Sequence, residues 1–202
     1  MNWKDDLQYI RSIRNYVLLS VILFTGAAIL GFLAAQKYPE LAVIQMEELG
    51  EMLKWILDLS PPLMMVAIFL NNLFTSTMAM LLGIGFGIVP AIVASMNGAL
   101  VGLVAYQVIK TKGLIFLVAA ILPHGIIELP TVLICIGVGF RLGHLLVQSL
   151  QRKEVNLGDE VKKVLSLLKW VVLLLFIAAA IETFITPLII HIVSPTSLPV
   201  ME

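Results

Sequence analysis

Pro123-His124-Gly125-Ile126-Ile127-Glu128-Leu129-Pro130 is a polar, helix-breaking stretch inside the apolar run 113–147. A run of about 35 residues is too long for one straight crossing, because a helix rises about 1.5 Å per residue and the hydrocarbon core is about 30 Å thick. Pro123 and Pro130 lack amide donors, and Gly125 weakens helix continuity. The sequence therefore predicts a membrane-spanning segment broken at 123–130. It leaves open whether the run crosses once or forms a re-entrant hairpin.

The composition of the chain is that of an integral membrane protein. Of its 202 residues, 60% are hydrophobic and 13% are charged, and the mean hydropathy is +1.02. A span takes about 20 apolar residues, which leaves no room for a separate soluble catalytic domain. The formal net charge of zero does not suggest nucleic-acid binding, and the single cysteine, Cys135, excludes an internal disulfide. We expect an all-α, polytopic transmembrane helix bundle with about five spans.

Apolar runs and breaks divide the chain into three parts. We expect an amphipathic interfacial segment at 1–15, a transmembrane bundle at 16–190 and a tail at 191–202. The spans are expected at about 16–35, 62–82, 88–109, 113–147 and 170–190. An ordinary helix that continues into the first span explains 1–15 equally well. The segment 40–60 is too charged to cross, the glycine-rich stretch 83–87 predicts a tight turn or helix break, and a basic amphipathic segment at 152–169 precedes the last span.

The distribution of lysine and arginine predicts the orientation in the cell membrane. Basic residues are enriched on the cytoplasmic side of multi-pass proteins. A cytoplasmic N-terminus puts eight of them inside and four outside if 113–147 crosses once. The eight are Lys4, Arg11, Arg14, Arg152, Lys153, Lys162, Lys163 and Lys169, and the four are Lys37, Lys54, Lys110 and Lys112. The C-terminus is then extracytoplasmic, and so is the 40–60 loop.

Several polar side chains are expected at membrane depth. His124 and Glu128 are four residues apart and share a helix face if that turn stays helical. A charged carboxylate there costs several kcal/mol, so Glu128 should be protonated, paired or close to water, with Arg141 and Glu182 as the available charged neighbours. The expected polar core is completed by amides. Its members are Asn71, Asn72, Asn97, His124, Glu128, Arg141 and Glu182.

Three interpretations of this core remain open: a buried ion pair or hydrogen-bonded kink, a site for an ion, proton or substrate, and a metal site. Interhelical hydrogen bonding explains the asparagines without any ligand. No cofactor is expected. Candidate metal ligands are His124, Glu128 and His144, but the order His-x-x-x-Glu is not the His-Glu-x-x-His of zinc proteases.

Three glycine pairs with four-residue spacing predict close helix packing. They are Gly83 and Gly87, Gly98 and Gly102, and Gly139 and Gly143. The odd number of spans leaves helix faces that a second copy of the chain or lipid could cover.

Four stretches carry a family resemblance. Phe69-Leu70-Asn71-Asn72 lies in the second span and Asn97-Gly98-x-x-x-Gly102 in the third. The 123–130 stretch is followed by Gly139-x-Arg141-x-Gly143, and the last span contains Glu182-x-Phe184-x-Thr186-Pro187. In these stretches the chain resembles the stage II sporulation protein M family, from the first span to Pro187.

This resemblance implies a membrane scaffold without catalytic activity of its own. The family's namesake holds two peptidoglycan-degrading partners at the septum of spore-forming bacteria. Relatives also occur in bacteria and archaea that do not sporulate, where that role cannot apply. We therefore expect a non-enzymatic scaffold that assembles membrane or extracytoplasmic proteins. A channel or transporter for a small solute or ion is the alternative, and an intramembrane zinc metalloenzyme is a third.

Overall fold

The computed structural model describes residues 3–193, and all regular structure in that range is helical. It contains five helices that are long and apolar enough to cross a membrane. They are Arg14–Lys37, Pro61–Ile84, Ile88–Lys112, Leu114–Leu150 and Gly158–Val193. The predicted fold class, an all-α multi-pass bundle, is confirmed. The expected tail 191–202 lies outside the described residues beyond position 193.

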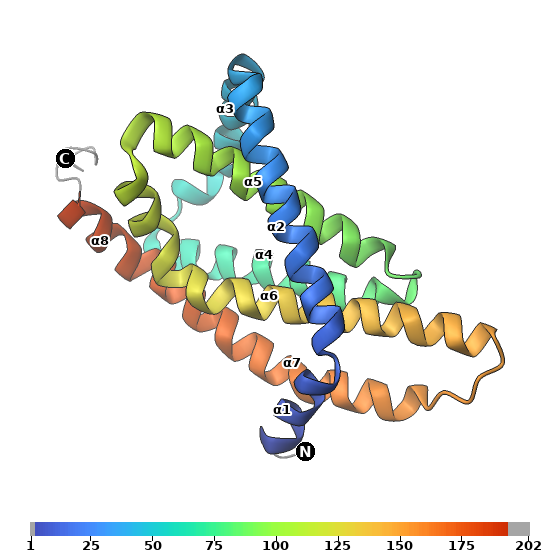
Figure 1. Cartoon of the computed structure of the whole chain (residues 1–202). Coiled ribbons are helices and arrows are strands. Elements are labelled where there is room, and N and C mark those ends of the chain that lie inside the picture. The colour runs from blue at the N-terminus through green and yellow to red at the C-terminus, as the bar shows by residue number, and fades with distance from the viewer. Residues whose placement is uncertain (1–2, 194–202) are drawn as a thin grey trace.

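Figure 1 shows the chain from blue at the N-terminus to red at the C-terminus. The helices in order are α1 (Trp3–Ser12), α2 (Arg14–Lys37), α3 (Pro39–Leu57), α4 (Pro61–Leu81), a short 3-10 helix (Leu82–Ile84), α5 (Ile88–Lys112), α6 (Leu114–Leu150), α7 (Leu157–Ala180), a π-helical turn (Ile181–Ile185) and α8 (Thr186–Val193). The tight turn predicted at 83–87 is observed, with Phe86 and Gly87 at φ of 58° and 75°.

Helix α6 is the centre of the bundle and contacts α2, α4, α5, α7 and α8. It is continuous through Pro123 and Pro130, so the predicted break is a bend, and the run forms no re-entrant hairpin. Figure 1 shows its yellow-green first turns running in a different direction from its yellow and orange remainder. The prolines are seven residues apart and therefore remove amide donors from the same side of the helix, which bends it. The Thr131 hydroxyl donates to the Ile127 carbonyl at 2.7 Å within this region.

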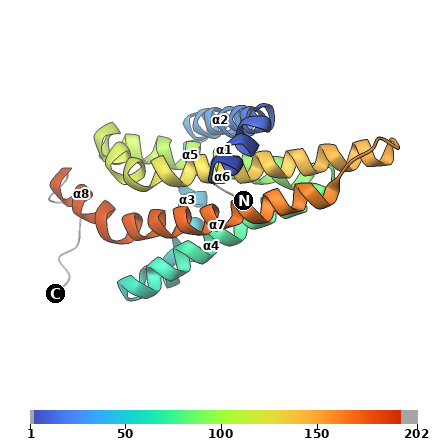
Figure 2. The same cartoon turned by 90° about the horizontal axis from the view of Figure 1, so that it is seen from below.

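The helix that contains the last predicted span begins well before that span. Helix α7 starts at Leu157, so most of the basic amphipathic segment belongs to the same helix as the span, while Arg152 and Lys153 lie in the loop before it. Figure 2 shows α6 and α7 as long helices joined by a narrow loop. Asn156 caps α7 by accepting a hydrogen bond from the Asp159 amide at 3.1 Å. A capped helix start and ion pairs along its first turns explain why this charged sequence continues directly into the span.

Glycines allow two pairs of helices to pack in close contact. Gly102 of α5 lies so near α2 that a methyl group on it would overlap the backbone of Ala28. A methyl group on Gly139 of α6 would likewise overlap the backbone of Ala79 in α4. The close packing expected for these glycines is observed, and it fixes α5 and α4 beside their neighbours.

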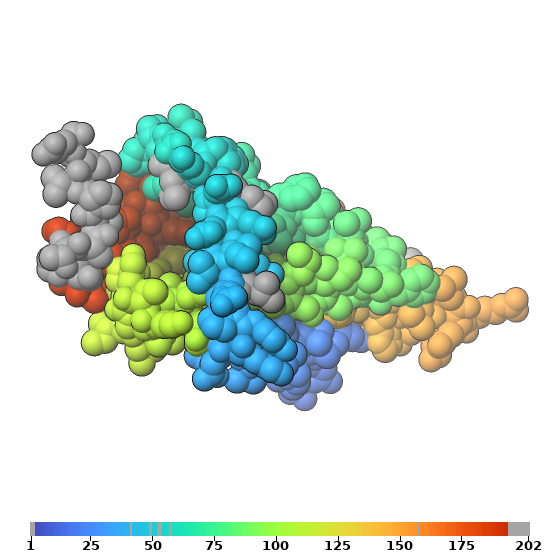
Figure 3. Space-filling model, turned by 90° about the horizontal axis from the view of Figure 1, so that it is seen from above, coloured from blue at the N-terminus to red at the C-terminus, as the bar shows by residue number. Residues whose placement is uncertain are grey.

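Helix α3 is not one of the five helices that could cross a membrane. It contacts α2, α4 and α5, and Figure 3 shows it lying across the face seen from above. Pro39 begins it, in the first turn where proline is tolerated, and it contains four glutamates and one lysine. The predicted charged segment between the first two spans is thus an ordered helix on the surface of the bundle.

Candidate functional site

A histidine and two carboxylates meet where α6 packs against the end of the last crossing helix. His124 and Glu128 are one turn apart on α6, and Glu182 lies in the π-helical turn between α7 and α8. One ligand atom from each residue lies within 4.8 Å of the other two. We call His124, Glu128 and Glu182 the carboxylate–histidine cluster.

The π-helical turn that holds Glu182 has a cause in the sequence. Pro187 follows it, lacks an amide donor, and would place its ring against the carbonyl of Thr183 in a regular α-helix. Widening the turn relieves that clash, and π-turns of this kind are frequent at functional sites. The Ile181 carbonyl accepts from the Thr186 amide and also from the Thr186 hydroxyl, the latter at 3.3 Å.

Thr186 also orients the histidine. Its Oγ1 lies 3.5 Å from Nδ1 of His124. Because the hydroxyl hydrogen points to Ile181, the oxygen can accept a hydrogen bond from Nδ1–H. This contact favours the tautomer with hydrogen on Nδ1, leaving Nε2 as a lone-pair donor.

The two carboxylates of the cluster have no cationic partner among residues 3–193. Neither Glu128 nor Glu182 forms an ion pair with any residue in the described range 3–193. Oε2 of Glu128 is buried and has no hydrogen-bond partner there. Two negative charges about 5 Å apart repel by roughly 3 kcal/mol at an effective dielectric constant of 20. The cluster is therefore suited to holding a proton or a cation.

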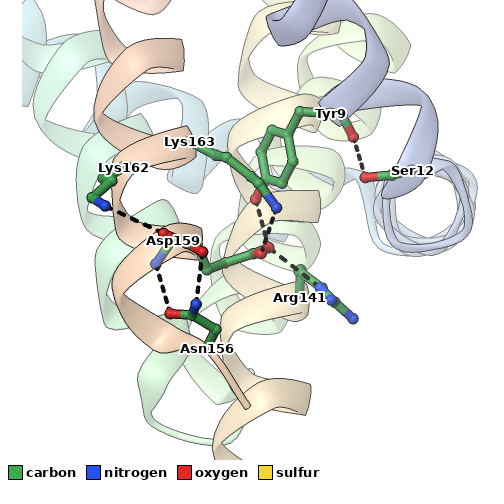
Figure 4. A network of polar contacts seen from close by, with 8 residues as sticks. Tyr9, Ser12, Arg141, Asn156, Asp159, Lys162 and Lys163 are labelled. Atoms are coloured by element: carbon green, nitrogen blue, oxygen red, sulfur yellow. Dashed lines mark hydrogen bonds and ion pairs between the residues drawn. The ribbon is translucent and has the colours of Figure 1, made fainter. Parts of the chain in front are cut away.

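Arg141 is not part of this cluster. Its Nε donates to Oε1 of Glu160 at 3.3 Å, and that same oxygen accepts from the Tyr9 hydroxyl at 3.0 Å. Nζ of Lys163 lies 3.7 Å from the other Glu160 oxygen. Figure 4 shows these side chains converging from α1, α6 and α7. Glu128 is thirteen residues before Arg141, about 20 Å along the helix, which is beyond the reach of the guanidinium.

Glu160 was not among the predicted site residues, because it lies in the segment 152–169, which was described only as basic and amphipathic. Its spacing carried a signal. Positions 160, 164, 167, 171 and 175 follow one helix face, and the other four are buried apolar residues: Val164, Leu167, Val171 and Leu175. An acidic residue that continues an apolar stripe in this way is predicted to be buried, and Glu160 is 5% exposed.

Helix α1 is attached to α7 by a second polar anchor. Asp6 is buried and accepts hydrogen bonds from Ser166 at 2.7 Å and from Nε1 of Trp170 at 3.0 Å. Nζ of Lys169 lies 3.1 Å from it. Burial alone raises the pKa of Asp6, but the hydrogen bonds and the charge of Lys169 outweigh it and hold the pKa below 3.8. The expected interfacial segment is thus a helix docked on the bundle through Asp6 and Tyr9.

The remaining predicted polar residues lie elsewhere. Asn71 donates to Asn72 at 3.3 Å on an exposed part of α4, and Asn97 donates to the Val93 carbonyl of its own helix at 2.8 Å. His144 is exposed and packs edge-on against Tyr16, with 5.8 Å between ring centroids. Of the three candidate metal ligands, His124 and Glu128 lie together and His144 does not, whereas Glu182 completes the group.

Comparisons with known proteins agree with this architecture. The family model for stage II sporulation protein M matches residues 20–187. An uncharacterized protein of Methanocaldococcus jannaschii is 31% identical over 174 residues, which cover 85% of this chain and 93% of that protein. No solved structure matches. The chain is a multi-pass membrane protein that belongs to the stage II sporulation protein M family.

Proposed function

We propose that this protein is a non-enzymatic membrane scaffold that binds a partner protein through α3, on the extracytoplasmic side. The observation that carries the proposal is an exposed stripe on α3. Ile44, Glu48, Glu51 and Trp55 are spaced by four, three and four residues, so they share one helix face, with Glu47 beside them. All five are exposed. We call these five residues the α3 stripe.

Most of the α3 stripe points away from the rest of the molecule, whereas Glu47 borders a pocket that α3 forms with α5 and α6. Ala42, on the opposite face of α3, is 3% exposed, whereas Ile44 and Trp55 are 50% and 61% exposed. Tryptophan is enriched among the residues that dominate binding energy at protein interfaces. A large aromatic side chain on an outward face of a surface helix supports docking of another protein there.

The charge of the stripe indicates the chemistry of the partner. Glu47 and Glu51 are four residues apart, and Glu48 and Glu51 are three apart, so like charges adjoin on one face and destabilise the isolated helix by a few tenths of a kcal/mol. A partner with lysines or arginines would relieve this repulsion, and an apolar pocket would take Trp55. We therefore propose a protein with a basic surface around an apolar pocket.

The orientation follows the distribution of basic residues. Helix α1 docks on the first half of α7, so the basic residues of both helices lie at the same end of the bundle. A cytoplasmic location for that end satisfies the positive-inside tendency. Helix α3 follows the first crossing helix and is then extracytoplasmic.

Charge reversal tests the proposal. The Glu48→Lys variant is compared with Glu154→Lys, which makes the same charge change at an exposed position in the α6–α7 loop. Each is purified from the native membrane after crosslinking. We expect one partner to copurify with the wild-type chain and with Glu154→Lys and to be lost from Glu48→Lys. Equal recovery with all three chains would refute docking on the α3 stripe.

A further inference from the structure

We propose that His124, Glu128 and Glu182 bind a divalent transition-metal cation, such as Zn²⁺, within the membrane bundle. This site is separate from the α3 stripe, and its test is independent of any partner protein. The donor set is one imidazole nitrogen and two carboxylate oxygens from two packed helices, with ligand atoms within 4.8 Å of one another. Imidazole and carboxylate are established ligands of zinc and related metals.

Charge balance favours a divalent ion. Two ionised carboxylates and a neutral histidine carry two negative charges, which one divalent cation cancels. A monovalent cation would leave one negative charge in a low-dielectric region, where an uncompensated charge is costly. The nearest potential counter-charge along α6, Arg141, is committed to Glu160.

A carboxylate oxygen without a hydrogen-bond partner among the described residues is a second, independent observation. Oε2 of Glu128 is buried without a hydrogen-bond partner among the described residues. An unpartnered carboxylate oxygen in a buried position is unfavourable unless something else fills its lone pairs. A bound cation beside Glu182 would do so.

The contact of His124 with Thr186 is also typical of a metal-binding histidine. Metal-binding histidines usually donate their other ring N–H to an oxygen that fixes the tautomer. Thr186 Oγ1 lies 3.5 Å from Nδ1 of His124 and can accept a hydrogen bond from that nitrogen, in the tautomer that leaves the lone pair on Nε2. Thr186 is thus a positioning residue, and Glu182 lies in the π-helical turn that precedes Pro187.

The decisive experiment measures zinc binding to the purified full chain, produced without a polyhistidine tag. Zinc content is measured by elemental analysis after dialysis, and the dissociation constant by competition with a chromophoric chelator. We expect one zinc per wild-type chain and a higher melting temperature with zinc than without it. His144→Gln, which alters an exposed histidine of the same helix, should bind zinc as the wild type does.

Two kinds of variant locate the ion. Glu128→Gln and Glu182→Gln keep the side-chain shape and should each lose the stoichiometric zinc and its stabilising effect. Thr186→Val should weaken zinc binding by about 10- to 100-fold, as expected for an outer hydrogen-bond partner, with little change in the melting temperature of the metal-free chain. Absence of zinc from the wild-type chain, or equal binding by Glu128→Gln and Glu182→Gln, would overturn the proposal.

Discussion

Nε of Arg141 lies 3.3 Å from Oε1 of Glu160. Arg141 is one-third exposed and Glu160 is almost completely buried, and Tyr9 donates to the same carboxylate oxygen. The pair therefore joins α6 and α7 to the N-terminal helix at one end of the bundle. It also leaves Glu128 and Glu182 without this arginine as a counter-charge.

Removing the Glu160 charge should destabilise the protein. Glu160→Gln leaves Arg141 and Lys163 without their carboxylate, at an expected cost of about 2 kcal/mol, because Glu160 is buried while Arg141 is partly solvated. Denaturant unfolding in detergent measures the change. Lys162→Ala is the control, since its ion pair with Asp159 is exposed, and it should cost less than about 0.5 kcal/mol. Equal effects of the two variants would contradict the assigned role of Glu160.

Docking of α1 should persist at neutral pH and fail only in acid. The pKa of Asp6 is depressed in the folded state, so its stabilising contribution is complete above the unfolded value near 3.8 and is lost as pH falls through the lower, folded value. A spin label at Leu7, an exposed position on α1, reports release of the helix. We expect an immobilised spectrum at pH 5 to 7 for the wild type and a mobile one for Asp6→Ala. Release of α1 in the wild type at pH 6 would be inconsistent with the pairing described.

Two glycines provide a matched test of packing. A methyl group on Gly102 would overlap the α2 backbone, whereas one on Gly26, within α2, would meet no atom within 4 Å. Gly102→Ala should destabilise the bundle by about 2 kcal/mol through overpacking. Gly26→Ala should be neutral or stabilising by up to about 1 kcal/mol, because alanine is the better helix former. Similar unfolding free energies for the two variants would show that α2 and α5 do not pack as closely as described.

The π-helical turn should depend on Pro187. Pro187→Ala restores an amide that can bond to Thr183 in a regular α-helix, which turns Glu182 away from Glu128. Cysteines at positions 128 and 182, in a chain with Cys135→Ala, are joined by a short bifunctional thiol reagent. We expect efficient crosslinking with Pro187 and a clear reduction with Pro187→Ala. An unchanged yield would mean that the turn has another cause.

The fold was largely predictable because membrane spans depend on local composition. Apolar runs predicted the number of crossing helices, and Gly83 to Gly87 predicted the turn between α4 and α5. Composition alone did not show that the basic segment and the last span form one continuous helix. Lys163 and Arg141 pair with Glu160, so part of the charge of that segment is neutralised within the helix.

The site was predictable only in part. His124 and Glu128 share a face because of their four-residue spacing, which a sequence displays directly. Glu182 lies beside them because α6 packs against the last helix. Arg141 pairs with Glu160 of α7 instead, which also depends on helix packing. Such pairings between distant residues depend on how helices pack, which periodicity alone does not specify. The asparagines illustrate the same limit, since Asn97 bonds to its own helix.

Site-specific photocrosslinking shows whether another protein docks on α3. A photoreactive amino acid is placed at Glu48, at Trp55, or at Leu30, which is 68% exposed within the first crossing helix and should face lipid. We expect positions 48 and 55 to give an adduct with the same protein, this protein to have a basic surface, and position 30 to give no protein adduct. No adduct at 48 and 55 in the native membrane, or the same adduct from all three positions, would show that α3 is not a docking surface.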